Sequence, residues 1–226
     1  MSENLVNYLS NFVTDRRIAL FRKIAQERTK YITVVLENLY QPQNASAVLR
    51  TCDCLGVQDV HIIENDNEYK INPDVELGSA QWLKLHRFRR DENNTLECIA
   101  NLKKQGYRIV ATTPHTNDVN IQDFDISKGK FALLFGEEQP GLSKIAMEQA
   151  DEFVKIPMFG FTESFNISVS AAICLHQLTL KLRNSDINWK LSDSENNELL
   201  LNWLRNTIKA VDLIEKDYHE KLLKQC

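Results

Sequence analysis

The chain has 226 residues, of which 43% are hydrophobic and 26% are charged, and its formal net charge is −4 at pH 7. Its length and composition indicate one large α/β domain with appendages, and the net charge argues against indiscriminate binding of polyanions. Residues 1–7 lack the basic start and apolar core of a signal peptide, and no apolar run reaches the roughly 20 residues of a membrane span. We therefore expect a cytoplasmic protein without membrane contact.

Five cysteines are scattered along the chain. Only two of them form a close pair, and a C-x-C pair without a second pair or a nearby histidine is weak evidence for a metal site. We expect reduced structural thiols and no bound metal. The cysteines are Cys52, Cys54, Cys98, Cys174 and Cys226.

Residues 3–29 are predicted to be helical, and they are basic although the whole chain is acidic. One interpretation is a solvated helix face, and the other is an arm that contacts nucleic-acid phosphates. The arginines that would make such contacts are Arg16, Arg17, Arg22 and Arg28.

A β-branched run at residues 33–36 predicts the first strand. Asn44 is a suitable N-cap for a helix over residues 45–55, which Gly56 would end. Arg50 lies on a different stripe of this helix from the apolar residues, between short neighbours that leave its guanidinium open to close approach. Arg50 is therefore either a solvated surface side chain or part of a site.

Strands are also predicted at residues 60–63 and 85–88, with a polar, irregular segment between them. The second of these strands lies in a basic stretch whose charged residues alternate with apolar ones, as at a strand edge, and which is a second candidate for phosphate contact. Its basic residues are Lys84, Arg87, Arg89 and Arg90.

A helix over residues 92–104 and a strand over residues 107–111 follow in the predicted order, with Gly106 between them. Residues 131–135 form the most apolar strand, which indicates a central position in the sheet. A further helix is predicted to begin at Ser143.

Three loops come directly after predicted strands, at residues 112–115, 136–141 and 157–166. In an open parallel sheet such loops lie at the same carboxyl edge, so we expect them to form one pocket. The chain has no dinucleotide fingerprint, no P-loop and no lysine in a glycine-rich turn. A neutral or cationic nucleoside-type ligand, held by backbone groups, fits this pattern best.

The chain ends in helices. One is predicted over residues 168–183, and Ser192 with Glu195 has the spacing of a capping box before a leucine-rich helix. A charged segment then runs to Cys226. This tail either covers the parent domain or packs on a neighbouring chain.

Three segments carry a resemblance to a known family. They are the N-x-x-A-x-x-R-T pattern at residues 44–51, the sequence Gly-Glu-Glu-Gln-Pro-Gly-Leu-Ser at residues 136–143, and the pattern I-P-M-x-G-x-x-x-S-x-N-x-S-V at residues 156–169. In this order they resemble the SpoU/TrmH branch of the SPOUT methyltransferases. The basic N-terminal helix and the helical tail resemble the tRNA guanosine-2′-O-methyltransferase type within that branch.

The resemblance implies an α/β fold with a mostly parallel sheet and a C-terminal trefoil knot, flanked by N- and C-terminal helices. It divides the chain into a basic helical arm (residues 1–30), a methyltransferase domain (residues 31–184) and a C-terminal helical extension (residues 185–226). It also implies a homodimer with the active site at the subunit interface.

The implied reaction transfers a methyl group from S-adenosylmethionine to a ribose 2′-OH in RNA, and the implied substrate is a D-loop guanosine of tRNA. By this resemblance Arg50 contacts the 2′-OH, but a guanidinium keeps its proton, so we favour an orienting role and leave the proton acceptor open. The implied catalytic residues are Arg50, Asn44, Glu138, Ser164 and Asn166. The implied cofactor-binding residues are Thr112, Gly136, Ile156, Met158, Phe165 and Asn166.

Other interpretations remain open. The chain could methylate ribosomal RNA, or it could be a catalytically silent module that binds RNA or senses the cofactor. Turn chemistry alone would explain Ser164 and Asn166, and Glu138 could be a solvated acid.

Overall fold

The structure is a computed structural model that describes residues 2–70, 72–89, 93–114, 118–137 and 139–223. The chain divides into two compact units. The first combines Met1–Arg28 with Lys190–Cys226, and the second is Thr29–Trp189. The two ends of the chain, which we expected as separate segments, therefore belong to one unit.

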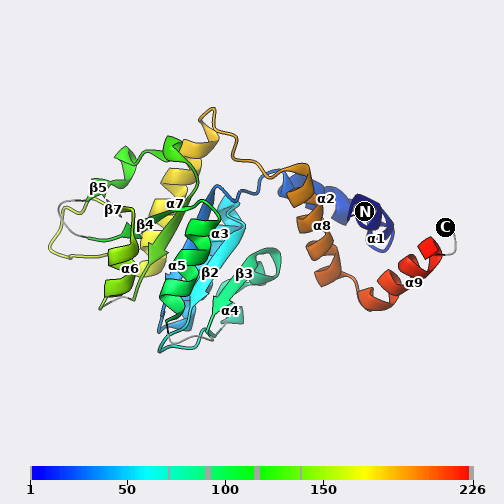
Figure 1. The fold of residues 1–226 in the computed structure, drawn as a ribbon, viewed down its shortest axis with the longest axis horizontal. Helices are drawn as coiled ribbons and strands as arrows, with labels where there is room; N and C mark the ends of the chain where they lie inside the picture. The colour runs from blue at the N-terminus through cyan, green and yellow to red at the C-terminus, as the bar shows by residue number, and fades with distance from the viewer. Residues whose placement is uncertain (1, 71, 90–92, 115–117, 138, 224–226) are drawn as a thin grey trace. The chain divides into compact units, whose positions relative to one another are not determined.

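The second unit is built on a sheet that has seven strands within the described residues, all of them parallel to their neighbours, in the order β3-β2-β1-β6-β4-β7-β5 (Figure 1). All five residues of β6 are buried, and β6 lies between β1 and β4, which confirms the central position predicted for this apolar run. The strands are β1 (Ile32–Glu37), β2 (Asp59–Ile63), β3 (Lys84–Phe88), β4 (Arg108–Thr112), β5 (Val119–Asn120), β6 (Phe131–Phe135) and β7 (Glu152–Lys155).

Helices cover both faces of this sheet (Figure 1). On one face α3 (Pro42–Leu55) and α7 (Ile167–Arg183) pack over Val34 and Leu36 of β1. On the other face α5 (Asn94–Lys104) and α6 (Lys144–Gln149) pack over Val35, because successive side chains of a strand point to opposite sides. The shorter elements are α4 (Pro73–Glu76), η1 (Ser79–Trp82), η2 (Ile121–Asp123) and η3 (Ile126–Lys128).

The C-terminal end of α3 agrees with the prediction from the sequence, and its N-terminal end differs from it. Gly56 ends the helix in the left-handed conformation, with φ of 79°, as predicted. The predicted start at Asn44 is wrong, because the helix begins at Pro42 with Gln41 as its N-cap. Proline is well suited to the first turn of a helix, because the N–H group that it lacks would have no partner there. Since α3 begins at Pro42, Asn44 lies inside the helix, where it is buried.

The first unit contains four helices among its described residues: α1 (Ser2–Ser10), α2 (Asp15–Ala25), α8 (Asp193–Thr207) and α9 (Val211–Leu223). The helical character predicted for residues 3–29 is confirmed, but as two helices, since Thr14 caps the second by accepting a hydrogen bond from the Arg17 amide. The capping box of Ser192 and Glu195 is confirmed. None of the described helices is long and apolar enough to cross a membrane.

Candidate functional site

The loops that follow β4, β6 and β7 meet in one cavity of about 390 Å³, which we call the three-loop pocket. Its lining comes from residues 112–114, from residues of the 136–142 loop and from residues of the 156–165 segment, and it is closed by the start of α7. The prediction that these three loops form one pocket is confirmed.

The loop after β6 doubles back on itself. Glu137 and Gly141 exchange backbone hydrogen bonds of 3.0 and 3.1 Å. A Cβ atom on Gly136 would lie 2.3 Å from the backbone of Gly141, so any side chain at this position would force the loop open. Gly141 itself has a φ of 72°, which favours glycine. The two glycines thus set the wall of the pocket.

A buried carboxylate holds the far end of this loop. Glu37, the last residue of β1, is 2% exposed. It accepts hydrogen bonds from the Ser143 amide (2.8 Å) and hydroxyl (2.7 Å) and from the Thr95 hydroxyl (2.6 Å). A charge this deeply buried requires such donors. Sequence reasoning missed Glu37, although an acidic residue at the end of an otherwise apolar strand was a visible signal.

The lining of the three-loop pocket is apolar, neutral polar or acidic. Ile156, Met158 and Phe165 supply apolar surface, and Glu163 supplies a carboxylate. The lining residues that the structure describes include no lysine, arginine or histidine. Burial raises the pKa of the Cys174 thiol in this lining to about 12, so the thiol stays protonated. This surface suits a neutral or cationic ligand better than a phosphate.

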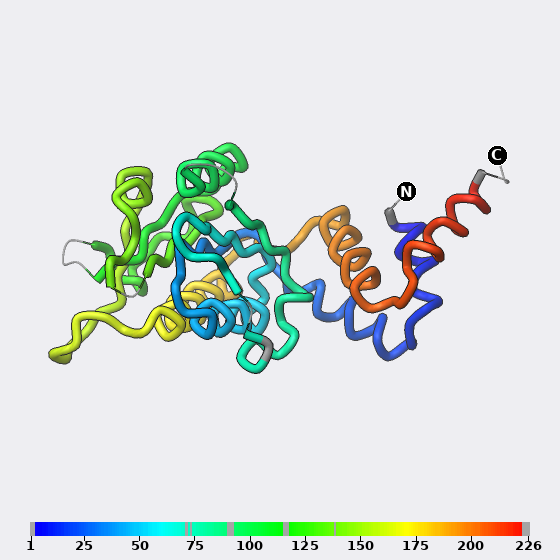
Figure 2. Tube along the Cα trace, turned by 90° about the horizontal axis from the view of Figure 1, so that it is seen from below, coloured from blue at the N-terminus to red at the C-terminus, as the bar shows by residue number. Residues whose placement is uncertain are grey.

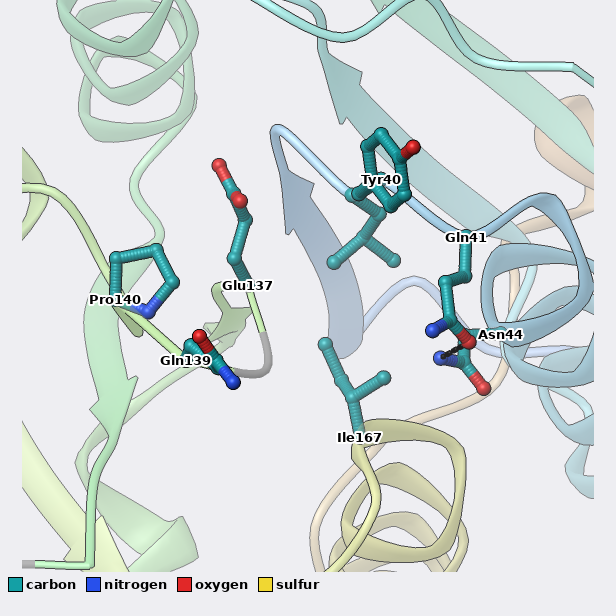
Figure 3. A pocket seen from close by; sticks show the side chains of 8 residues that line it. Tyr40, Gln41, Asn44, Glu137, Gln139, Pro140 and Ile167 are labelled. Carbon is teal, nitrogen blue, oxygen red and sulfur yellow. Dashed lines mark hydrogen bonds between the residues drawn. The ribbon is translucent and has the colours of Figure 1, made fainter.

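A second cavity of about 280 Å³ shares Glu137, Gln139, Pro140 and Ile167 with the first (Figure 3). It lies between the loops that follow the neighbouring strands β1 and β6. The chain leaves β1 for α3 on one face of the sheet and leaves β6 for α6 on the other. Ligands bind in open α/β sheets at such a switch point, so we call this cavity the switch-point pocket.

The first and third sequence motifs meet at the edge of the switch-point pocket. Asn44 lines it, donates to the Gln41 side chain at 3.2 Å, and accepts a hydrogen bond from the Asn166 amide at 3.2 Å. Asn166 is also the N-cap of α7, where its Oδ1 accepts from the amide (2.9 Å) and hydroxyl (2.6 Å) of Ser168. The two asparagines therefore tie the start of α7 to the start of α3.

Most of the predicted cofactor residues lie together. Asn166 does not line the three-loop pocket but sits beside Asn44. The Thr112 hydroxyl donates to the Leu134 carbonyl at 2.7 Å, so it also holds β4 against β6. Glu138 lies outside the described residues. The predicted residues that do line this pocket are Thr112, Gly136, Ile156, Met158, Phe165 and the predicted catalytic residue Ser164.

Arg50 is not brought to either cavity. Its side chain is exposed on α3 and lines neither the three-loop pocket nor the switch-point pocket. Val48 and Cys52 on the same helix point into the core instead. Within one chain, the predicted catalytic arginine is thus separate from the other motif residues.

The predicted RNA-binding arginines of the N-terminal segment differ in exposure. Arg16, Arg17 and Arg22 are exposed on α2. Arg28 is only 3% exposed, and its guanidinium lies 5.4 Å from the centre of the Trp203 ring. The expectation of a surface position for Arg28 is therefore wrong, because its side chain is packed against an aromatic residue of its own unit.

In the basic stretch around β3, Lys84, Arg87 and Arg89 are all exposed, and Arg90 lies outside the described residues. Arg87 makes two hydrogen bonds of 2.9 and 2.7 Å to the Glu64 carboxylate, and these bonds raise the pKa of Arg87. Its guanidinium is thus already engaged by a carboxylate of the same unit.

Four of the five cysteines lie in the described residues, where all four are free thiols, three of them buried. Cys226 lies outside this part of the chain. Within the described ranges, no group of three His, Cys, Asp or Glu side chains is placed to hold a metal ion.

Comparison with known proteins gives consistent results. A tRNA (guanosine(18)-2′-O)-methyltransferase of Borreliella burgdorferi is 43% identical over 210 residues, which cover 93% of this chain and 94% of that protein. The protein of the same name from Escherichia coli K12 is 30% identical over 190 residues, covering 81% and 80%. The crystal structure of an A. aeolicus TrmH/SpoU tRNA modifying enzyme has a TM-score of 0.76 and 28% identity, covering 86% of this chain and 98% of that one. Residues 31–176 match the SpoU rRNA Methylase family, and the chain belongs to this family.

Proposed function

We propose that this protein transfers a methyl group from S-adenosylmethionine to the ribose 2′-OH of a tRNA guanosine, in the D-loop as the sequence analysis implied. The observation that carries the proposal is the pair of adjoining pockets at the carboxyl edge of the sheet, with the family's motif residues along their linings. One pocket suits the methyl donor, and the other suits the nucleoside that receives the methyl group. The choice of tRNA and of guanosine rests on the names of the relatives.

The lining of the three-loop pocket supports S-adenosylmethionine as the donor. The apolar side chains of Ile156, Met158 and Phe165 match the adenosine and the carbon chain, and the carboxylate of Glu163 suits the cationic groups. When bound, the donor supplies an electrophilic methyl group on a positively charged sulfur. We assign its binding to these residues together with Thr112 and Gly136, and the reaction requires no metal.

The residues at the rim orient the nucleotide. A ribose hydroxyl is a poor nucleophile, so much of the rate enhancement comes from holding its oxygen in line and contacting its proton. Asn44 lines the switch-point pocket and accepts a hydrogen bond of 3.2 Å from Asn166, and Ser164 lies in the lining of the three-loop pocket. We assign these three residues to positioning the nucleotide. The catalytic role implied for Glu138, which lies outside the described residues, remains a prediction.

Arg50 completes the site from a second subunit. Its exposed position outside both pockets is what a residue that acts across a homodimer interface requires. A guanidinium keeps its proton in nearly all protein settings, so Arg50 orients the hydroxyl and the neighbouring phosphate and stabilises charge. The active site therefore lies at the interface of the dimer.

We also infer that the C-terminal part of the second unit is a trefoil knot. The support is the path of the chain after β7, which pairs with β4 and β5. After β7 the chain passes the loop that follows β6, and both segments line the three-loop pocket. The chain then enters α7, which packs on α3. A crystal structure in which residues 156–189 lift away without passing through a loop would contradict this inference.

Exposed basic residues provide the contacts to tRNA. Arg16, Arg17 and Arg22 on α2 and Lys84 and Arg89 around β3 have exposed side chains, and we assign the phosphate contacts to them. We leave out Arg28 and Arg87, because Trp203 and Glu64 already engage them. The substrate places the proposed reaction in the cytoplasm.

Two measurements test the proposal. Calorimetry with S-adenosylmethionine should show binding, and a tritiated methyl assay should label unmodified tRNA in preference to ribosomal RNA fragments. Preferential labelling of ribosomal RNA would favour the alternative substrate. That alternative has weaker support, since the 23S rRNA (guanosine-2′-O-)-methyltransferase RlmB of Coxiella burnetii is 30% identical and only 62% of its length is covered. Donor binding without labelling of any RNA would identify a silent module.

A further inference from the structure

We propose that Glu137 recognises the base of the target nucleotide, by accepting hydrogen bonds from the N1–H and 2-amino groups of guanine while the base stacks on Tyr40. This inference rests on the proposed function and adds to it the group that selects guanosine. Neither residue was singled out in the sequence.

The two walls of the switch-point pocket come from two different loops (Figure 3). Tyr40, Gln41 and Asn44 form one wall, from the connection between β1 and α3. Glu137 and its neighbours after β6 form the other, and Ile167 lies between the walls. A flat ligand in this pocket can place one face on the aromatic ring of Tyr40 and turn an edge toward the carboxylate of Glu137.

The Tyr40 ring is available to a ligand. Its side chain is 77% exposed although it is a large aromatic residue, and it has no ring contact with any residue that the structure describes. Enzymes that act on one nucleotide bring it out of its stack and replace the lost neighbours with aromatic side chains. The position of Tyr40 at the open side of the pocket suits this purpose.

The Glu137 carboxylate is held in place by Asn38, whose Nδ2 also donates to the Asp66 carboxylate at 3.1 Å. Asn38 donates from its Nδ2 to Glu137 Oε1 at 2.5 Å. Asn38 is itself fixed, since its Oδ1 accepts from the amides of Asp66 and Asn67 at 2.8 Å each, and its φ of 57° is one that asparagine tolerates. A carboxylate has about four acceptor positions. Among the described residues, Asn38 fills one of these positions on Glu137. The remaining positions can accept hydrogen bonds from a ligand.

The hydrogen-bonding pattern of guanine matches this carboxylate. Its Watson–Crick edge presents two adjacent donors, N1–H and the 2-amino group, which a carboxylate accepts side by side. Adenine presents an unprotonated N1, whose lone pair faces the negative charge unfavourably. Inosine keeps N1–H and lacks the 2-amino group. Glu137 therefore favours guanosine over inosine and disfavours adenosine most.

The test compares three tRNAs that carry guanosine, inosine or adenosine at the methylated position. With the unaltered protein we expect kcat/KM to fall about tenfold for inosine and about a hundredfold or more for adenosine. Glu137→Gln has the same shape but replaces one acceptor by a donor. We expect it to lower kcat/KM for guanosine about tenfold to a hundredfold and to bring guanosine and inosine within about a factor of two.

Matched controls separate base recognition from folding. Glu148→Gln changes an exposed glutamate of α6, paired with Lys144 outside both pockets, and should leave all three values unchanged. Tyr40→Ala should raise KM, because it removes the ring on which the base stacks. Circular dichroism and the urea midpoint should be the same for Glu137→Gln as for the unaltered protein.

The possible failures are distinguishable. A Glu137→Gln protein with the guanosine-to-inosine ratio of the unaltered protein would overturn the inference and leave the proposed function intact. An unaltered protein that binds the donor and labels none of the three tRNAs would overturn the proposed function, and the inference with it.

Discussion

Glu37 and Asn38 are consecutive residues at the end of β1, and together they hold both ends of the loop that follows β6. Glu37 binds Ser143 at the end of that loop, and Asn38 binds Glu137 near its start. Asn38 follows the last residue of β1 and has a left-handed backbone with φ of 57°, and the two side chains reach different ends of the loop. The loop shared by the two pockets is therefore fixed from the neighbouring strand.

Arg50 is the residue on which the proposed chemistry depends most. Arg50→Ala should keep the fold and the affinity for S-adenosylmethionine, because the side chain is exposed and lines neither cavity. Methyl transfer should fall about a hundredfold to a thousandfold, as when one preorganised donor is removed from an active site. Single-turnover assays with tRNA provide the measurement.

The control for Arg50 is Arg50→Lys, which keeps the charge but loses the forked geometry and should restore only part of the activity. Methylation by Arg50→Ala at the rate of the unaltered protein would remove Arg50 from the mechanism.

At the scale of elements, the β2–β3 pair carries a pH-sensitive contact. His61 is 4% exposed, and its ring stacks on that of His86 at 4.5 Å between centres. Burial, followed by the charge of His86, lowers the pKa of His61 to about 3, although Asp59 opposes this change. His86 is in turn 3.3 Å from the Asp59 carboxylate.

This contact should make the protein less stable in acid. Between about pH 6.5 and pH 3 the unfolded chain binds a proton on His61 that the folded protein does not bind. The free energy of unfolding should therefore fall with decreasing pH in this window, by up to about 1.4 kcal/mol per pH unit from this residue. Urea denaturation at about pH 7 and about pH 5 measures the change, and His61→Phe should reduce it. Equal pH dependence in the two proteins would exclude His61 as its source.

Helix α2 is expected to act as an electrostatic contact to tRNA. Replacement of Arg16, Arg17 and Arg22 by glutamine should weaken tRNA binding, and the slope of log K against log salt concentration should shrink by about 0.7 to 0.9 per lost phosphate contact. The affinity for S-adenosylmethionine should not change. Lys216→Gln, an exposed lysine of α9 in the same unit, is the control. A similar loss of donor affinity in the triple variant would indicate a structural role for α2 instead.

The elements that sequence predicted well are those set by neighbours along the chain. The left-handed end of α3 at Gly56, the capping box of Ser192 and the buried strand β6 all follow from local patterns. The parallel sheet then placed three loops at one edge, which is why the three-loop pocket was predictable.

The features that sequence missed depend on distant residues. Glu37 and Ser143 are 106 positions apart, and Asn44 and Asn166 are 122 positions apart. The role of Asn44 as the partner of Asn166 rather than a helix cap, and the packing of Arg28 on Trp203, arise only once the fold brings these residues together. No local pattern contains this information.

At the scale of the whole molecule, the segment after β7 marks the proposed dimer interface. It extends away from the sheet before the chain returns into α7 (Figure 2). Phe159 in this segment is 98% exposed, and Phe161 is fully exposed. Large apolar side chains gathered on a surface mark an interaction site, and here they lie next to the three-loop pocket.

Replacement of Phe159 and Phe161 by serine should therefore weaken the homodimer. Each buried phenylalanine contributes about 1.5–3 kcal/mol, so the dissociation constant should rise at least about a hundredfold for the pair. Sedimentation equilibrium measures this constant, and Phe12→Ser, which changes an exposed phenylalanine of the other unit, is the control. An unchanged dissociation constant would place the dimer interface elsewhere.

The most direct test of the account is to map the methyl group after incubation of the protein with S-adenosylmethionine and unmodified tRNA. Mass spectrometry of the digested product should find 2′-O-methylguanosine, with the added mass on the ribose fragment. A tRNA with 2′-deoxyguanosine at the same position should gain no methyl group there. A methyl group on the base, on another nucleoside or on no tRNA at all would contradict the claim that the two pockets bring a methyl donor and a guanosine ribose together.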